Sequence, residues 1–208
     1  MKKSSMNLPN TLSIIRCLLV PVFVAALLLM RDAGIWAYIV PAAIYGLTAL
    51  TDMLDGNIAR KYNLVTDFGK FIDPLADKFM VISSMVAILA WMLIRGQTTL
   101  ALIFVWLVLI ILLRELGVTS LRLVVSGKSG IVVAASILGK IKTITQMVGT
   151  LLIILEPAIP MVLPFDAVAY VCDSHIISYV CMAIMAFTTI FSGIDYLKSY
   201  MPYIDSNK

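Results

Sequence analysis

Long apolar segments separated by short polar stretches make up most of this chain. There are six of them, at residues 12–30, 34–51, 78–94, 99–121, 143–164 and 175–197. A helix needs about 20 residues to cross the hydrocarbon of a bilayer. Several segments are shorter than this. Each short segment continues into polar residues, and these ends would extend into water on the same side of the bilayer. Because no period-two alternation is present and lipid admits only helices or closed barrels, the pattern predicts six transmembrane helices.

The composition also indicates an integral membrane protein. Hydrophobic residues make up 61% of the 208 positions and charged residues 13%, whereas soluble domains average about 45–50% and about 25%. No stretch remains for a separate soluble domain, so we expect one transmembrane domain over residues 1–208. Residues 1–10 would be a polar N-terminal segment, and residues 198–208 would be a C-terminal tail.

The basic residues predict the orientation of the helices. If both termini face the cytoplasm, only Arg31 and Arg95 of the sixteen lysines and arginines fall on the outer side. We therefore expect a multi-pass protein of the cell membrane with both termini in the cytoplasm. The net charge of +4 then belongs to a face that suits anionic lipid headgroups. Nucleic acid is excluded as a partner, because there is neither a separate basic domain nor an interleaving of basic and aromatic residues.

Acidic residues cluster between the second and third apolar segments, where burying charge beside a membrane would be costly. At about 100° per residue, Asp52 and Asp55 share one helical face with the small residues Gly56 and Ala59. Small side chains there would let a bulky ligand approach the backbone. Arg60 lies at the edge of the same face, where its charge would suit a phosphate group.

A second acidic face follows after a polar break. Gly69, Asp73 and Asp77 are spaced at steps of four, so they also share a face. Four carboxylates facing one another would repel strongly in a low dielectric, and divalent cations would relieve that repulsion. An oxygen-rich site without Cys or His suits Mg²⁺, Mn²⁺ or Ca²⁺, and two such ions held by carboxylates serve phosphoryl chemistry. A remaining carboxylate could take a proton from an attacking hydroxyl.

These residues also have purely structural interpretations. Asp73 precedes Pro74, and an Asp-Pro pair is a common N-cap with proline at the first helical position. Glycine and alanine at helical spacing often serve helix packing in membranes. Asp67, which lies outside the pattern, is interpreted as a loop or cap residue. Four acids in phase on two helix ends, with glycines alongside, favour a metal site over these separate explanations.

The order of these residues resembles the signature of the CDP-alcohol phosphotransferases. It reads Asp52-x2-Asp55-Gly56-x2-Ala59-Arg60-x8-Gly69-x3-Asp73-x3-Asp77 and fixes eight residues over 26 positions. The resemblance implies a fold of six transmembrane helices, usually in a homodimer. It also implies an enzyme that moves a CDP-linked phosphoryl group onto an alcohol and releases CMP. Two divalent ions, Mg²⁺ or Mn²⁺, would be held at the cytoplasmic side by Asp52, Asp55, Asp73 and Asp77.

The same resemblance implies individual roles within the signature. Asp77 would be the general base of the reaction in addition to its link to the metal. Gly56, Ala59 and Gly69 would line the nucleotide pocket, and Arg60 would contact phosphate.

Charged residues in the other cytoplasmic segments bear on the alcohol acceptor. They are Arg114, Glu115 and Arg122 near the end of the fourth apolar segment and Lys140, Lys142 and Thr143 at the start of the fifth. Glu115 and Arg122 share a helical face because they are seven residues apart. Cytoplasmic basic residues often do no more than orient helices. An acceptor with its own phosphate would need such partners, however, whereas choline would need an aromatic cage and an uncharged alcohol would need neither.

Four further stretches resemble the branch of this family that makes phosphatidylglycerol phosphate. They are "NLPNTLSIIRCLLVP" near the start, "RE" at 114–115, "LR" at 121–122 and "GKIKT" at 139–143. The likeness implies that the phosphatidyl group of CDP-diacylglycerol, whose acyl tails stay in the membrane lipid, passes to sn-glycerol 3-phosphate. The six residues named above would bind the acceptor, and Asn7 and Arg16 would contact CDP.

Two alternatives stay open at this point. Another enzyme of the same family could make cardiolipin, phosphatidylserine or phosphatidylinositol phosphate; the basic residues disfavour serine but do not exclude inositol phosphate. A transporter or channel could use the acids as an ion path, since ionisable groups inside membranes often mark such paths. The acids cluster at one end instead of stepping through the bilayer, which favours the enzyme.

Overall fold

The computed structural model is built from helices. It describes the backbone of residues 8–62, 66–129 and 136–204 and, within these ranges, all side chains except those of residues 8, 9, 52–62, 67, 70, 126–129 and 202–204. The long helices are α1 Leu8–Leu29, α2 Trp36–Tyr62, α3 Asp67–Ile94, α4 Thr98–Ser129, α5 Ile137–Leu155 and α8 Ile176–Ile204. Three short elements connect α5 to α8: η1 Glu156–Ala158, α6 Ile159–Val162 and α7 Asp166–Asp173. No strand occurs in the described ranges.

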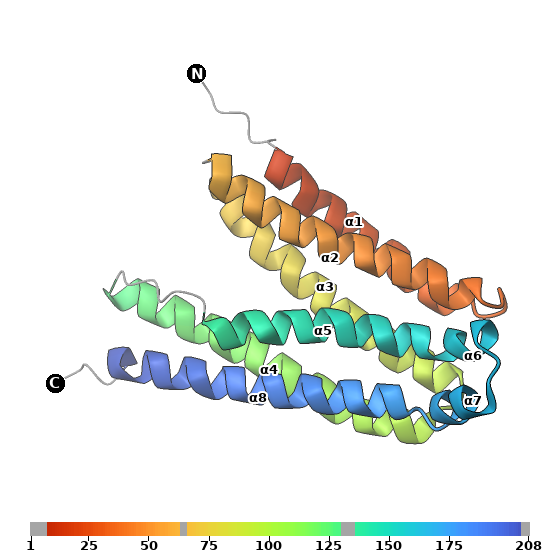
Figure 1. The fold of residues 1–208 in the computed structure, drawn as a ribbon. Helices are drawn as coiled ribbons and strands as arrows, with labels where there is room; N and C mark the ends of the chain where they lie inside the picture. Colours follow the sequence, from red (N-terminus) through yellow and green to blue (C-terminus); the bar gives the residue numbers. More distant parts are fainter. Residues whose placement is uncertain (1–7, 63–65, 130–135, 205–208) are drawn as a thin grey trace.

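The six long helices form two groups of three within one bundle (Figure 1). α1 packs against both α2 and α3, and α8 packs against both α4 and α5. Contacts between α3 and α4 and between α2 and α5 join the two groups. α1 begins and α8 ends at the same end of the bundle, where α2 and α4 also end and α3 and α5 begin. This end, called the polar end below, collects the charged segments of the sequence.

Large apolar side chains cover the outside of the bundle. Leu18, Trp106 and Leu113, for example, are 66%, 70% and 77% exposed, which suits contact with hydrocarbon and not with water. Five helical segments are each long and apolar enough to cross a membrane, and α2 contributes the shorter apolar segment Trp36–Thr51. The prediction of an all-α membrane protein with six apolar helices is therefore confirmed, and the chain is a multi-pass membrane protein.

The interior of the bundle is mainly apolar, and buried polar side chains also occur toward the polar end. Phe104 and Met185 are completely buried in the apolar part. Ser13, Lys142 and Ser192 are buried in the halves of α1, α5 and α8 that are nearer to the polar end. Buried polar groups are costly in a membrane protein unless they are paired, and they commonly mark a functional site. The functional residues are therefore to be sought at the polar end.

The fifth transmembrane helix differs in its bounds from the expected segment 143–164. α5 begins earlier, at Ile137, because Ser136 acts as its N-cap and accepts a hydrogen bond from the backbone N–H of Gly139 at 3.1 Å. Its α-helix ends at Leu155, but the apolar span continues through the short helical elements to Val162, close to the expected end. Three prolines follow Leu155: Pro157, Pro160 and Pro164. Since proline lacks the backbone N–H and clashes with the preceding turn, the apolar run breaks into short helical pieces.

Glu156 ties this connection to the start of α8. Its side chain accepts hydrogen bonds from the backbone N–H groups of Ile177 at 2.9 Å and Ser178 at 3.1 Å, and from the Ser178 hydroxyl. Glu156 is completely buried. The first N–H groups of a helix have no partner within the helix, and a carboxylate there also complements the helix dipole. Glu156 therefore stabilises the start of the last transmembrane helix.

Replacing Glu156 by alanine should destabilise the protein without altering its chemistry. The change leaves buried N–H groups without an acceptor, a loss of about 1–3 kcal/mol, which should lower the melting temperature by on the order of 5 °C. Thermal unfolding of the purified protein in detergent measures the shift. Asp32→Ala is the matched control, because Asp32 lies in the α1–α2 connection at the same end and its side chain is 91% exposed. A Glu156→Ala variant that melts with the wild type would contradict the capping role.

Candidate functional site

Two hydrogen bonds join α1 to the acidic residues of α3. Ser13 Oγ donates to Asp73 Oδ1 at 2.6 Å, and Arg16 Nη1 donates to Asp77 Oδ1 at 2.8 Å. The donors are three residues apart on α1 and the acceptors four apart on α3, so each pair lies on one helical face. Ser13 and Arg16 are 0% and 1% exposed, whereas the Asp77 side chain is 58% exposed. The α1 side of this contact is therefore buried, and the Asp77 carboxylate is accessible.

The start of α3 is held against α1 by a second group of polar contacts. Thr66 is the N-cap of α3, and its side chain accepts from the backbone N–H of Gly69 at 3.0 Å. Asn10 Nδ2 of α1 donates to Thr66 Oγ1 at 2.8 Å. A Cβ atom on Gly69 would lie 2.7 Å from Asn10 Oδ1, so a larger residue here would displace the Asn10 side chain from its contact with Thr66. The expected place of Gly69 in the nucleotide pocket stays a prediction.

Asp73 lies inside a helix and does not cap one. α3 begins at Asp67, and Pro74 is an internal residue of this helix. The N-cap alternative for Asp73 is therefore wrong, because Thr66 already caps the helix two turns earlier. Asp67 is the first residue of α3, directly after the Thr66 cap, so its interpretation as a loop or cap residue is also wrong.

A cavity of about 260 Å³ lies beside the two aspartates of α3. Its lining comes from α3, α4 and α8: Asp73, Pro74, Asp77, Lys78, Arg114, Glu115, Val118, Thr119, Arg122 and Tyr196. The fold thus brings two of the expected metal ligands together with three of the expected acceptor residues, although the two sets lie far apart in the sequence. α3 supplies two carboxylates to this cavity, and α4 supplies two guanidinium groups.

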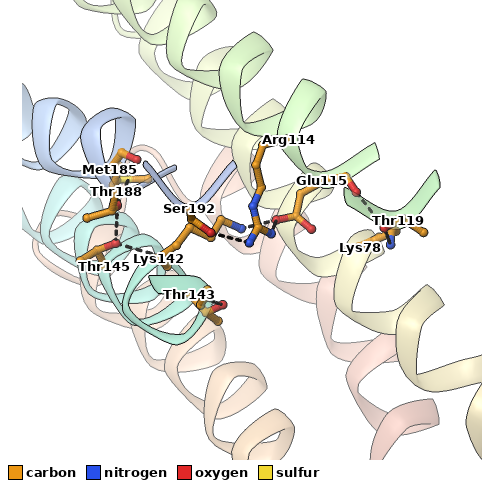
Figure 2. A network of polar contacts seen from close by, with 11 residues as sticks. Lys78, Arg114, Glu115, Thr119, Lys142, Thr143, Thr145, Met185, Thr188 and Ser192 are labelled. Carbon is orange, nitrogen blue, oxygen red and sulfur yellow. Dashed lines mark hydrogen bonds and ion pairs between the residues drawn. The ribbon is translucent and has the colours of Figure 1, made fainter. Parts of the chain in front are cut away.

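A polar network continues from the cavity into the bundle (Figure 2). Glu115 Oε1 accepts from Arg114 Nη1 at 3.0 Å and from Lys142 Nζ. Arg114 Nη2 donates to Ser192 Oγ at 2.7 Å, and the guanidinium carbon lies 5.2 Å from the centroid of the Tyr196 ring. These contacts link α4, α5 and α8. Because two cations share the single carboxylate of Glu115, this group of three keeps a net positive charge beside the cavity.

The expected acceptor residues divide into those that line the cavity and those that do not. The three residues of α4 belong to the lining. Lys142 is 2% exposed and pairs with Glu115 behind the lining. Lys140 and Thr143 are exposed on α5 and, among the described residues, do not belong to the lining. The α4 residues could therefore contact an acceptor in the cavity directly. Lys142 could act on an acceptor only through its ion pair with Glu115.

Three polar or aromatic residues of the lining were not predicted from the sequence: Lys78, Thr119 and Tyr196. Lys78 Nζ donates to Thr119 Oγ1 at 2.7 Å and so joins α3 to α4. Thr119 lies one helical turn beyond Glu115, and this helical phase was a usable signal. No such signal exists for Tyr196, because only the packing of α8 against α4 brings it to the cavity.

Part of the expected site lies outside the described residues. Asn7 is not described, and on α2 the side chains are not described at five expected positions: Asp52, Asp55, Gly56, Ala59 and Arg60. Among the side chains that are described, no group of three or more acidic, histidine or cysteine residues could hold a metal ion.

Asp73 and Asp77 supply oxygen donors one turn apart beside a cavity. This donor chemistry fits a hard divalent ion such as Mg²⁺ or Mn²⁺.

Comparison with known proteins identifies the family of this chain. A model of the CDP-alcohol phosphatidyltransferase family matches residues 6–192. The CDP-diacylglycerol--glycerol-3-phosphate 3-phosphatidyltransferase of Bacillus subtilis is 35% identical over 201 residues, which cover 92% of this chain and 94% of that relative. A probable phosphatidylglycerophosphate synthase of Mycobacterium tuberculosis is 35% identical over 191 residues, which cover 92% of this chain and 80% of that relative. A relative from Rickettsia felis, which has the same name as the Bacillus subtilis protein, is 33% identical over 197 residues. The matched residues cover 95% of this chain and 97% of that relative.

The chain therefore belongs to the CDP-alcohol phosphatidyltransferase family. It is a membrane enzyme that transfers a phosphatidyl group, and this finding removes the transporter alternative. Enzymes of this family generally depend on divalent metal ions. The resemblance carried by the eight signature residues is confirmed.

Proposed function

We propose that this enzyme transfers the phosphatidyl group of CDP-diacylglycerol to sn-glycerol 3-phosphate, giving phosphatidylglycerol phosphate and CMP. The observation that carries the proposal is a cavity with two kinds of lining residue. Asp73 and Asp77 come from α3, and Arg114 and Arg122 come from α4. An acceptor with a hydroxyl and a phosphate matches it, because the hydroxyl needs a base and the phosphate needs cations. The names of the relatives contain the same donor and acceptor.

The donor side of the proposed site belongs to α2 and α3. Two divalent ions, Mg²⁺ or Mn²⁺, would be held by Asp52, Asp55, Asp73 and Asp77. When bound, such ions neutralise the diphosphate and stabilise the charge that develops on departing CMP. The remaining donor contacts come from small residues that line the nucleotide pocket and polar residues that reach CDP or phosphate: Gly56, Ala59, Gly69, Arg60 and Asn7. Arg16 is 1% exposed and bonded to Asp77, and its contact with CDP stays a prediction.

Asp77 is the base in the proposed reaction. Its side chain is 58% exposed and lines the cavity, so an acceptor hydroxyl can approach it. The acceptor oxygen gives its proton to Asp77 and bonds to the phosphorus that carries diacylglycerol, while the bond from that phosphorus to CMP breaks. Removing the proton makes the hydroxyl oxygen a stronger nucleophile at the moment it attacks.

Cations of α3 and α4 would bind the acceptor phosphate. Arg114 and Arg122 bring guanidinium groups to the cavity, and Lys78 adds an ammonium group. Arginine offers parallel N–H donors that match a phosphate group. Glu115, which is itself paired with Lys142, holds Arg114 in place through the 3.0 Å hydrogen bond. A phosphorylated alcohol would therefore lie with its phosphate toward α4 and its hydroxyl toward α3.

The bias of basic residues supports a cytoplasmic position for this site. We propose that both termini and the cavity face the cytoplasm, and that residues 1–208 form one membrane domain that works as a homodimer. A cavity at the polar end would let a small charged acceptor arrive from water while the acyl tails of the donor stay in lipid.

A comparison of acceptors tests the proposed function. Purified enzyme with CDP-diacylglycerol and Mg²⁺ should release CMP with sn-glycerol 3-phosphate and give only background release with serine, inositol 1-phosphate or phosphatidylglycerol. The reason is that serine and phosphatidylglycerol carry no phosphate monoester, and the ring of inositol 1-phosphate is bulkier than the three-carbon chain of sn-glycerol 3-phosphate. Chromatography of released CMP provides the measurement. Release with inositol 1-phosphate but none with sn-glycerol 3-phosphate would show that the acceptor is misassigned within the family.

A further inference from the structure

We infer that Ser13 and Arg16 of α1 are positioning residues for the divalent-ion site. They hold the carboxylates of Asp73 and Asp77 in the orientation that binds the ion, and so set the affinity for it. The inference rests on the proposed role of these two aspartates as metal ligands. It extends the metal site to α1, whereas all eight signature residues lie between positions 52 and 77.

In both contacts a side chain of α1 donates a hydrogen bond to one carboxylate oxygen of an α3 aspartate. Ser13 Oγ lies 2.6 Å from Asp73 Oδ1, and Arg16 Nη1 lies 2.8 Å from Asp77 Oδ1. Each donor bonds to the Oδ1 atom of its aspartate. A hydrogen bond of this kind restricts the rotation of the carboxylate and so gives its oxygens a defined direction. Because Asp73 and Asp77 are one turn apart, both restricted carboxylates lie on the same side of α3.

The burial pattern places the α1 residues behind the carboxylates. Ser13 and Arg16 are 0% and 1% exposed, while Asp73 and Asp77 line the cavity. Neither α1 residue belongs to the described lining of the cavity, whereas both aspartates do. Carboxylates that bind metals are commonly held in this way by hydrogen bonds from residues that do not touch the metal.

Arg16 could instead be a stand-in cation that a metal ion displaces from Asp77. The neighbouring contact argues against this, because the neutral hydroxyl of Ser13 makes the equivalent hydrogen bond to Asp73 and has no charge to contribute. The two interpretations predict opposite effects on metal affinity. Removing a stand-in cation strengthens metal binding, whereas removing a positioning residue weakens it.

Binding of Mn²⁺ in the absence of turnover distinguishes these interpretations. Electron paramagnetic resonance of free Mn²⁺ during titration of the full-length protein in detergent, without CDP-lipid, yields the dissociation constant. Ser13→Ala and Arg16→Gln should each weaken Mn²⁺ binding by about 10–100-fold. Ser13→Thr keeps the hydroxyl and should restore binding to near the wild-type level. Cys17→Ala, at the next position of the same helix, is the matched control and should leave the dissociation constant unchanged.

A kinetic measurement separates positioning from direct catalysis. In Ser13→Ala, the Mn²⁺ concentration that half-activates CMP release should rise by the same factor as the dissociation constant, while kcat returns to near wild type at saturating Mn²⁺. A loss of kcat that saturating Mn²⁺ does not restore would overturn the inference. If Arg16→Gln does not yield folded protein, the comparison of Ser13→Ala with Ser13→Thr decides the question.

The outcomes also separate this inference from the proposed function. Unchanged or tighter Mn²⁺ binding in the α1 variants, with a wild type that binds Mn²⁺ and releases CMP, would overturn the positioning role alone. A wild-type protein that binds no Mn²⁺ would overturn both the positioning role and the proposed metal site.

Discussion

Asp77→Asn should reduce CMP release by a factor of about 10²–10⁴ while the protein stays folded. Asparagine cannot accept the proton of the acceptor hydroxyl, and it lacks the negative charge that would hold a metal ion. Its amide oxygen can still accept the hydrogen bond from Arg16 Nη1, so the contact between α1 and α3 is retained. Initial rates of CMP release at saturating substrate measure the effect, and thermal unfolding in detergent checks the fold.

Asp67→Asn is the matched control for this variant. Asp67 is the first residue of the same helix and lies outside the acidic pattern, so its replacement should leave the rate nearly unchanged. If Asp77→Asn keeps a rate within a few-fold of the wild type, another group accepts the proton and Asp77 is not the base.

Arg122→Ala should raise the apparent KM for sn-glycerol 3-phosphate by about 10–100-fold, the usual effect of losing a hydrogen bond to a charged group. The KM for CDP-diacylglycerol should change little, because Arg122 belongs to α4, whereas the expected donor side of the site belongs to α2 and α3. Arg122 is exposed, so its truncation opens no void in the core. Steady-state kinetics with each substrate varied in turn give the two KM values.

Arg31→Ala provides the comparison for Arg122→Ala. Arg31 lies in the connection between α1 and α2, at the end of the bundle opposite the cavity, and its side chain is 61% exposed. Both KM values should be unchanged in this variant. An Arg122→Ala enzyme with the wild-type KM for sn-glycerol 3-phosphate would exclude Arg122 from the acceptor site.

Features that depend on spacing within one helix could be predicted from the sequence. The apolar runs predicted the transmembrane helices, because lipid forces each run to satisfy its own backbone groups. Steps of four placed Asp73 and Asp77 on one face of a helix, and the structure finds both residues inside α3 and in the wall of one cavity. The bounds of the fifth helix were predicted less well, because the cap at Ser136 and the prolines after Leu155 act locally against the apolar pattern.

Features that depend on two distant segments could not be predicted in this way. Lys142 was an expected acceptor residue, but it is buried and turns to Glu115 on another helix. Arg16 was an expected CDP contact, but it is buried against Asp77. Tyr196 reaches the cavity from α8 and had no signal in its own segment. In each case the partner is on another helix, and its position depends on how the helices pack.

By itself, the sequence determined that this protein is helical, lies in a membrane and carries the signature of a CDP-alcohol phosphatidyltransferase. Those properties follow from hydrophobicity and from residue spacing along single helices. Only the tertiary structure decided that buried residues of α1 contact the aspartates of α3 and that residues of α3, α4 and α8 line a common cavity. Burial and hydrogen bonding between helices depend on packing over the whole bundle, and no local spacing specifies them.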